Sequence, residues 1–383
     1  MFNSTHIELS KSALSNNLQF IRQHLKEEVE LSLVLKGNAY GHGISQMVEM
    51  AESLGAKHFS VYSADEALEV FSVAKHKPTI LIMGFINRQS MLWAINNDVE
   101  FFVFDRARLE MAISCAKECA KQAKIHLELE TGMYRTGFDF AALPDVIKLI
   151  KENSDHLNTV GCCTHFAGAE SISNYVRIKK QQRAFKRYLS FLNKEGLEFK
   201  QVHTCCSAAA IRYPNMHYNM VRMGIMIYGF WPSDEIFVEF SNLTSNPGQD
   251  PLKRLITWKS EVMEIKLVPK GEFIGYGTSY LAHEDTLIAL IPVGYGYGYA
   301  RSLSNTGRVL INGMRAGVVG TVNMNCIAVN VTKIDSIKIG DEAVLIGGEG
   351  ANEISVASFS RFSEQLNYEL LTRIPQNIPR IIK

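Results

Sequence analysis

Short β-rich runs recur through the first 230 residues, with helical patterns between most of them. Eight such runs cover residues 31–35, 58–62, 79–83, 99–104, 125–129, 159–164, 201–205 and 224–228. Helical patterns cover residues 10–26, 45–54, 106–123 and 174–194. Apolar strands that alternate with helices predict an α/β fold, a (β/α)8 barrel of the TIM type. A doubly wound open sheet is the alternative, but no GxGxxG follows the first strand, which weakens its dinucleotide-binding version.

The pattern changes near residue 232, where a stretch rich in Ser, Asn, Pro and Gly begins and extends to residue 251. Beyond it, apolar residues alternate with period two in runs at 258–268, 286–292, 308–311, 316–319, 326–331 and 343–346. We therefore predict a barrel over residues 10–235 and a mainly antiparallel β domain over 236–383, with one helix near 355–366. The alternating segment within residues 1–9 is a candidate strand to pair with that domain.

Composition argues against several classes of partner. The net charge of the 383-residue chain is +1, so nothing indicates binding to nucleic acid or to an anionic membrane. No apolar run approaches the length of a membrane span, and the first residues lack the features of a signal peptide. The seven cysteines have neither metal nor redox spacing, so we expect no metal site and a reducing, cytoplasmic location.

Lys36 ends the apolar run 31–35 and is followed by a turn rich in Gly, Asn and Tyr. Burial at the end of a strand lowers the pKa of a lysine and makes its amine a better nucleophile. Such a lysine is a candidate for a Schiff base, including the one that holds pyridoxal 5'-phosphate (PLP). The alternative is an ordinary lysine at a strand end that reaches solvent.

Further polar residues fall at the predicted carboxyl ends of barrel strands, where barrels of this kind carry their chemistry. Glu128 to Arg135 stand at and after the fifth strand, and His165 follows the sixth. Ser207 follows the seventh strand, and Arg222 precedes the eighth. This grouping predicts one site that these residues share with Lys36.

Several segments, taken together, identify a family. Lys36 with the following Asn-Ala-Tyr-Gly-His-Gly resembles the PLP-lysine signature of alanine racemases. Six further segments resemble that family in the same order: Glu130-Thr-Gly-Met-Tyr-Arg135, Thr164-His-Phe-Ala167, Ser207-Ala-Ala, Val221-Arg-Met-Gly-Ile225, Gly275-Tyr-Gly277 and Ile291-Pro-Val-Gly-Tyr295. The resemblance covers nearly the whole chain, and it implies a PLP-dependent racemase that interconverts L- and D-amino acids with two bases.

The resemblance implies a role for each catalytic candidate. Lys36 would hold PLP and act as one base, and Tyr276 would act as the other from the opposite face. His165 would lie beside the tyrosine, which is a poor base at its usual pKa of about 10. Arg222 would face the pyridine nitrogen without protonating it, because an arginine keeps its proton. On their own, Tyr276 could be a turn aromatic and Arg222 a surface ion-pair residue.

The resemblance also implies binding residues and a partner. The groups that would bind the PLP phosphate are Tyr40, Ser207, Tyr368 and the amides near Gly224 and Ile225. Arg135 and the backbone N–H of Met324 would bind the substrate carboxylate. The active site would be shared within a homodimer, with Tyr276 supplied by the partner. Whether the D-amino acid is a peptidoglycan precursor or belongs to catabolism stays open.

The chain departs from the family pattern at four places that bear on the substrate. Glu128 replaces a lysine that is often carbamylated, and we expect its carboxylate to brace Arg135; the alternative is an outward-facing strand residue. The segment around Tyr295 reads Gly-Tyr-Gly-Tyr-Gly instead of Gly-Tyr-Ala-Asp-Gly. Gln376 replaces a pocket tyrosine, and Asn325 follows Met324 where the family has Asp. We therefore predict alanine as substrate, with serine or a wider range tolerated.

Two other functions share parts of this pattern. Decarboxylases of basic amino acids combine a barrel with a β domain, but they place an acidic group at the pyridine nitrogen, where this chain has Arg222. A non-catalytic PLP-binding protein would resemble the barrel alone, and the β domain with Tyr276 argues against it.

Overall fold

A computed structural model describes residues 4–243, 247–356 and 367–383. The chain forms two compact units. The first, called here the barrel unit, comprises Ser12–Lys36 and Met47–Lys253. The second, the sheet unit, comprises Met1–Lys11, Gly37–Gln46 and Arg254–Lys383. A short piece after Lys36 thus belongs with the C-terminal part of the chain rather than with the barrel.

The barrel unit is built on eight parallel strands in the order β8-β7-β6-β5-β4-β3-β2-β9. Their apolar residues are buried on both faces, as in barrels whose outer side is covered by helices. Between the two end strands, the backbone N–H of Arg222 donates to the carbonyl of Cys205 at 2.9 Å, so the sheet is nearly closed. The predicted barrel is confirmed. The strands are β2 (Glu30–Val34), β3 (His58–Val61), β4 (Thr79–Ile82), β5 (Glu100–Val103), β6 (Ala123–Glu128), β7 (Leu157–Cys163), β8 (Gln201–His203) and β9 (Met220–Met223).

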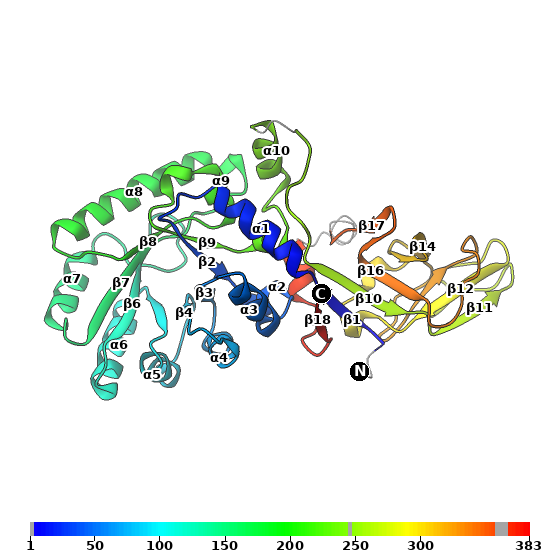
Figure 1. The fold of residues 1–383 in the computed structure, drawn as a ribbon, viewed down its shortest axis with the longest axis horizontal. Helices are drawn as coiled ribbons and strands as arrows, with labels where there is room; N and C mark the ends of the chain where they lie inside the picture. The colour runs from blue at the N-terminus through cyan, green and yellow to red at the C-terminus, as the bar shows by residue number, and fades with distance from the viewer. Residues whose placement is uncertain (1–3, 244–246, 357–366) are drawn as a thin grey trace. The chain divides into compact units, whose positions relative to one another are not determined.

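Helices connect the strands and lie on the outer side of the sheet (Figure 1). Several begin at a side chain that caps them: Ser63 forms a capping box with Glu66, and Asp105 accepts from the N–H of Arg108. The helices are α1 (Lys11–Gln23), α2 (Lys36–Tyr40), α3 (Ile44–Ser53), α4 (Ala64–Val73), α5 (Arg88–Asn96), α6 (Arg106–Cys119), α7 (Leu143–Glu152), α8 (Tyr175–Lys194), α9 (Ser207–Arg212) and α10 (Asp234–Asn242), with 3-10 turns η1 (Ile172–Asn174), η2 (Pro214–Met216) and η3 (Ile225–Tyr228).

The eighth strand lies earlier than the sequence pattern suggests. Residues 224–228 were predicted to form it, but Ile225–Tyr228 is a buried 3-10 turn and the strand is β9. A short apolar run looks alike in a buried strand and a buried turn, whereas Arg222 breaks the apolar pattern of the true strand. Helix α10 likewise stands in a stretch predicted to be loop, with Ser233 as its cap.

The sheet unit holds a mainly antiparallel sheet in the order β11-β12-β15-β14-β13-β16-β10-β1-β18, with β17 paired to β16. Strand β1 pairs antiparallel with β10 and parallel with β18. The run at 258–268 divides into two strands, and the helix predicted near 355–366 falls largely outside the described residues. The elements are β1 (His6–Leu9), β10 (Ile256–Glu261), β11 (Glu264–Val268), β12 (Thr286–Ile291), η4 (Tyr295–Tyr297), η5 (Arg301–Leu303), β13 (Arg308–Ile311), β14 (Met314–Val318), β15 (Ile327–Asn330), β16 (Glu342–Glu349), β17 (Asn352–Ile354), α12 (Asn367–Thr372) and β18 (Arg380–Ile382).

Candidate functional site

The segment after Lys36 is a left-handed turn. Gly37, Asn38 and Ala39 have φ of 65°, 53° and 52°, and Tyr40 has φ of 51°. A left-handed conformation costs a residue other than glycine roughly 1–2 kcal/mol, so a run of them is sustained only where surrounding contacts impose it. Such strain clusters at functional sites. The predicted PLP lysine therefore stands at the start of a conformationally unusual turn.

Contacts within the sheet unit hold this turn. The Nδ1–H of His42 donates to the carbonyls of Ala39 at 3.1 Å and Tyr40 at 3.0 Å. A Cβ on Gly41 would lie 1.9 Å from the carbonyl oxygen of Leu371, so the glycine permits a close approach to α12. The rings of Tyr40 and Tyr368, two predicted phosphate ligands, meet edge to face with centroids 6.1 Å apart.

Lys36 is exposed as a residue, and the pKa of its ammonium group is lowered. Leu35 before it is fully buried, whereas the Lys36 side chain is exposed. Burial of its amine against the barrel lowers the pKa below the ordinary value, and the charges of Arg135 and Arg222 lower it further. Cys206 and Glu66 partly oppose this effect. An amine that gives up its proton readily is what a Schiff base requires.

Arg222 is buried and points across the strand ends, so it is not a surface ion-pair residue. Its Nη2 donates to the carbonyl of Thr164 at 3.0 Å, and its Nη1 donates to both Nδ1 and the carbonyl oxygen of His203. Within the described residues its Nε–H has no hydrogen-bond partner, so one donor remains for an acceptor atom of a ligand.

His165 follows β7 and lies close to the same cations. Burial, together with the charges of Arg222, Arg135 and Lys36, lowers the pKa of His165 to about 3. The ring is therefore neutral at physiological pH. Because one histidine responds to all three cations, four of the predicted site residues meet at this end of the barrel.

A buried chain of hydrogen bonds leads away from Arg222. His203 Nε2 lies 2.9 Å from His126 Nδ1, and His126 Nε2 lies 2.8 Å from a carboxylate oxygen of Glu100. Both rings are fully buried. Arg222, His203, His126 and Glu100 stand on β9, β8, β6 and β5, so the chain crosses the barrel interior. We call these four residues the Arg222 relay.

The chemistry of the relay determines its proton positions. An arginine only donates, so Nδ1 of His203 must accept and its Nε2 must carry the proton. The same reasoning places the His126 proton on Nε2, facing Glu100. Burial opposes ionisation of Glu100, but the hydrogen bond from His126 and nearby charges lower its pKa below the ordinary value. Burial and the charge of Arg222 lower the pKa of His203 well below its usual range. Two neutral rings thus connect a cation to an anion.

The loop that carries Arg135 is folded around Glu130. Its carboxylate accepts backbone N–H groups from Gly132, from Met133 at 2.7 Å, from Tyr134 at 2.7 Å and from Arg135 at 3.3 Å. Four amides on one carboxylate fix a loop backbone strongly. Arg135 is exposed at the end of this loop. Its backbone is therefore held by Glu130, a residue to which we had given no role of its own.

Glu128 lies at the carboxyl end of β6 and is buried, so it is not an outward-facing strand residue. It accepts a 2.7 Å hydrogen bond from Thr136 Oγ1. Burial raises the pKa of Glu128, while the bond from Thr136 and the charges of Arg135 and Arg222 oppose the rise. Among the described residues, neither arginine forms an ion pair with it, so its influence on Arg135 is exerted through space.

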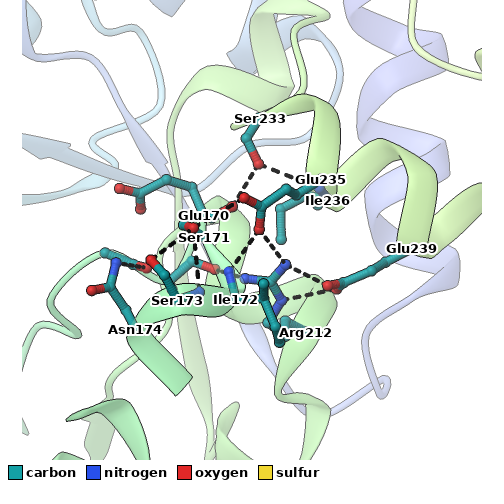
Figure 2. A network of polar contacts seen from close by, with 12 residues as sticks. Glu170, Ser171, Ile172, Ser173, Asn174, Arg212, Ser233, Glu235, Ile236 and Glu239 are labelled. Atoms are coloured by element: carbon teal, nitrogen blue, oxygen red, sulfur yellow. Dashed lines mark hydrogen bonds and ion pairs between the residues drawn. The ribbon is translucent and has the colours of Figure 1, made fainter. Parts of the chain in front are cut away.

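A polar network anchors the loop that follows His165 (Figure 2). Arg212 on α9 forms a bidentate pair with Glu239 of α10 at 2.8 and 2.5 Å, and donates to the carbonyl of Ala169 at 2.7 Å. Glu235, also on α10, accepts the backbone N–H of Ile172 at 2.6 Å and the hydroxyl of Ser171 at 3.0 Å. The loop is thereby tied to α9 and α10.

Ser207 and Gly224, two predicted phosphate ligands, lie together in the barrel unit. The buried hydroxyl of Ser207 accepts the backbone N–H of Gly224 at 3.0 Å. Ile225 follows at the start of η3. The remaining predicted phosphate ligands, Tyr40 and Tyr368, belong to the sheet unit.

The other predicted residues of the sheet unit lie on exposed turns. Tyr276 is 75% exposed between two glycines with positive φ, and its carbonyl accepts from Thr321 Oγ1 at 3.5 Å. Tyr295 and Met324 lie close together, because the N–H of Tyr295 donates to the carbonyl of Asn323 at 3.0 Å. Gln376 is exposed, and its carbonyl accepts from Arg380.

Two further observations concern cofactors and membranes. In the part of the chain that the structure describes, no three His, Cys, Asp or Glu side chains gather in a way that suits a metal ion. No helix in the same residues has the length and apolar character needed to cross a bilayer.

Comparison with known proteins agrees with this arrangement. A family model described as alanine racemase, N-terminal domain, matches residues 9–232, and one described as alanine racemase, C-terminal domain, matches residues 255–382. The chain belongs to the alanine racemase family. The predicted family and enzyme class, an amino-acid racemase, are therefore confirmed.

Individual relatives cover almost the full length. The alanine racemase of Leptospira interrogans is 34% identical over 99% of this chain and 96% of its own. Alanine racemase 2 of Bacillus subtilis is 33% identical over 98% of this chain and 93% of its own. The structure of alanine racemase from Bacillus anthracis, solved with bound L-Ala-P, superposes with a TM-score of 0.90 at 31% identity, covering 100% and 96% of the two chains.

Sequence reasoning missed the inner residues of this racemase-family site. Glu100, His126 and His203 are polar residues within strands whose neighbours are apolar, and this contrast was the available signal. It could not show that three strands far apart in sequence bring these side chains into one chain of hydrogen bonds. Glu130 was read only as part of a motif.

The relay predicts ring protonation states that NMR can test. We expect 15N-labelled protein to show His126 and His203 as neutral rings protonated at Nε2, because Arg222 and Glu100 orient both. Glu100→Gln keeps an acceptor oxygen but removes the charge, so the Nε2 proton of His126 should move upfield. Glu110→Gln, which alters an exposed partner of Arg106, is the control. An Nδ1-protonated His203 in the wild type would contradict the relay.

Proposed function

We propose that the protein is a PLP-dependent racemase that interconverts L- and D-alanine and also accepts serine. The observation that carries this proposal is the Lys36 amine, whose pKa is lowered by burial and by the charges of Arg135 and Arg222. Around it lie a buried arginine, Arg222, and a neutral histidine, His165. This group of residues is suited to amine chemistry at an anionic amino acid.

The residues present fit PLP. Lys36 supplies the amine, Arg222 has an unused Nε–H for the ring nitrogen, and the Ser207 hydroxyl, which accepts the Gly224 N–H, keeps its own hydrogen to donate to the phosphate. When bound, PLP supplies an electron-accepting ring that makes the Cα proton of an amino acid acidic. Tyr40, Tyr368 and Ile225 stay proposed phosphate ligands on the strength of the family resemblance.

The protein's own groups perform the proton transfers. Lys36 is proposed to remove or return the proton on one face of Cα, and the Tyr276 hydroxyl on the other. His165, neutral because of its surroundings, can accept a hydrogen bond from a tyrosine hydroxyl placed beside it and so orient that hydroxyl. Arg222, held by the relay, would donate to the ring nitrogen of bound PLP without protonating it, because an arginine keeps its proton, and would so limit how much charge the ring withdraws. A decarboxylase with an acidic group at that nitrogen is not favoured, because the residue there is Arg222.

Substrate recognition follows from the exposed loops. Arg135, whose backbone is fixed by Glu130, and the backbone N–H of Met324 are proposed to bind the carboxylate. Glu128 is proposed to favour the cationic loop electrostatically. Tyr295 and Gln376 are proposed to face the substrate side chain. A cytoplasmic homodimer, with Tyr276 entering the partner's site, completes the proposal.

Lys36→Ala should abolish cofactor-dependent racemisation, because both the Schiff-base amine and one base are lost. We expect at least about a hundredfold loss of kcat for L-alanine, the scale of a missing acid–base group. Borohydride reduction of the wild type followed by peptide mapping should label Lys36. The exposed Lys57→Ala is the control. Labelling at another lysine would overturn the assignment.

Tyr276→Phe should also be inactive, since the phenyl ring has no proton to exchange. If sites are shared, mixing Lys36→Ala with Tyr276→Phe subunits should restore part of the activity, because one site of each hybrid dimer keeps both bases. Activity is measured by chiral chromatography after subunit exchange has been verified with labelled subunits. An absence of recovery despite complete exchange would rule out sharing.

Gln376→Tyr should shift the preference from serine toward alanine. The amide can exchange hydrogen bonds with a serine hydroxyl, and losing one such bond costs roughly 0.5–1.5 kcal/mol, about three- to tenfold in specificity. The ratio of kcat/KM for serine to that for alanine is the measurement, and Asn377→Tyr, at the exposed neighbouring position, is the control. An unchanged ratio would refute the pocket argument and leave the racemase assignment intact.

A further inference from the structure

Arg380, the first residue of β18, binds two separate backbone segments of the sheet unit at once. Its Nε and Nη2 donate to the carbonyl of Gly41 at 3.2 and 2.9 Å. Its Nη1 donates to the carbonyls of Pro375 at 3.0 Å, Gln376 at 3.0 Å and Ile378 at 2.6 Å. One guanidinium thus engages four carbonyl oxygens from two stretches more than 330 residues apart in the chain.

The partners of Arg380 are all backbone carbonyls. Among the described residues no carboxylate forms an ion pair with it, and burial lowers the pKa of Arg380 to about 10. A partly buried guanidinium needs several acceptors to replace water, and its planar fork can reach them in fixed directions. The guanidinium of Arg380 therefore donates its hydrogen bonds to backbone carbonyls and does not pair with a charged side chain among the described residues.

Both segments that Arg380 contacts belong to the proposed site: one directly follows Lys36, and the other carries Gln376. Gly41 ends the left-handed turn that begins directly after Lys36, and its carbonyl follows the two carbonyls to which the His42 Nδ1–H donates. The stem of Arg380 also packs on this turn, since a Cβ on Gly43 would lie 3.0 Å from Arg380 Cδ. The second segment carries Gln376, the residue proposed to contact the substrate side chain.

We propose that Arg380 is a positioning residue that couples the turn after Lys36 to the Gln376 segment and thereby sets which amino acids the racemase accepts. The inference rests on the proposed function, because Gln376 selects a side chain only if the site takes amino acids. Arg380 touches neither substrate nor cofactor in this scheme. It acts by keeping the Gln376 backbone at a fixed place relative to the turn that follows the PLP lysine.

The test compares three variants of the full-length holoenzyme. Arg380→Lys keeps the charge but offers one nitrogen instead of three, and Arg380→Met keeps only the stem. Arg373→Met is the matched control, because Arg373 lies in the same C-terminal segment but forms an exposed ion pair with Glu369. Kinetics for L-alanine and L-serine are measured along with thermal unfolding.

The coupling predicts a change in selectivity beyond any loss of stability. Arg380→Met should lower kcat/KM for alanine at least tenfold and change the serine-to-alanine ratio at least threefold, and Arg380→Lys should show smaller changes of the same kind. Arg373→Met should leave both values unchanged. A folded Arg380→Met with an unaltered ratio would overturn the proposal.

Hydrogen exchange in the wild type keeps the test decisive if the variants do not fold. Peptides covering residues 37–43 and 375–380 should open together, with the same dependence on denaturant. Independent opening of the two segments would overturn the coupling. This measurement needs no activity, so it stands even if the wild type proves not to racemise alanine, a result that would refute the proposed function instead.

Discussion

Three cationic side chains, Lys36, Arg135 and Arg222, lie at the carboxyl end of the barrel strands. The properties of the site depend on the electrostatic repulsion between them. Burial, together with the neighbouring cations, makes a further proton harder to hold, so the pKa of Lys36 falls and His165 stays neutral. A lysine that must act as nucleophile and base benefits directly from such neighbours. The same positive field suits a substrate carboxylate and a cofactor phosphate.

Such a cluster would be costly if the structure did not also supply anions and oriented dipoles. Glu100 balances Arg222 through two neutral histidines, and Glu128 lies near enough to Arg135 and Arg222 for their charges to affect its pKa. Glu130 has a different role, because its carboxylate accepts hydrogen bonds from backbone amides of the loop that carries Arg135. The anions therefore offset the positive charge, while the side chain of Arg135 has no ion-pair partner among the described residues.

Backbone conformation matters as much as charge at Lys36. The left-handed turn that follows the lysine is unfavourable for Asn38, Ala39 and Tyr40, and it persists because groups of the sheet unit engage its carbonyls and pack against its glycines. The unit that holds this turn is completed by residues near the C-terminus. The position of the residue after Lys36, the proposed catalytic lysine, thus depends on segments near the C-terminus.

The sequence by itself determined the barrel, the β domain and the outer site residues. Strand periodicity, turn residues and the order of short motifs are local signals, and Lys36, His165, Ser207 and Arg222 follow from them. Tertiary structure alone decided the placement of the last strand, the relay from Arg222 to Glu100 and the contacts of Arg380 with the Gly41 carbonyl. These features arise because strands and loops distant in the chain bring polar groups together in a buried space. No local pattern encodes that meeting, since each partner on its own is an ordinary polar residue among apolar ones.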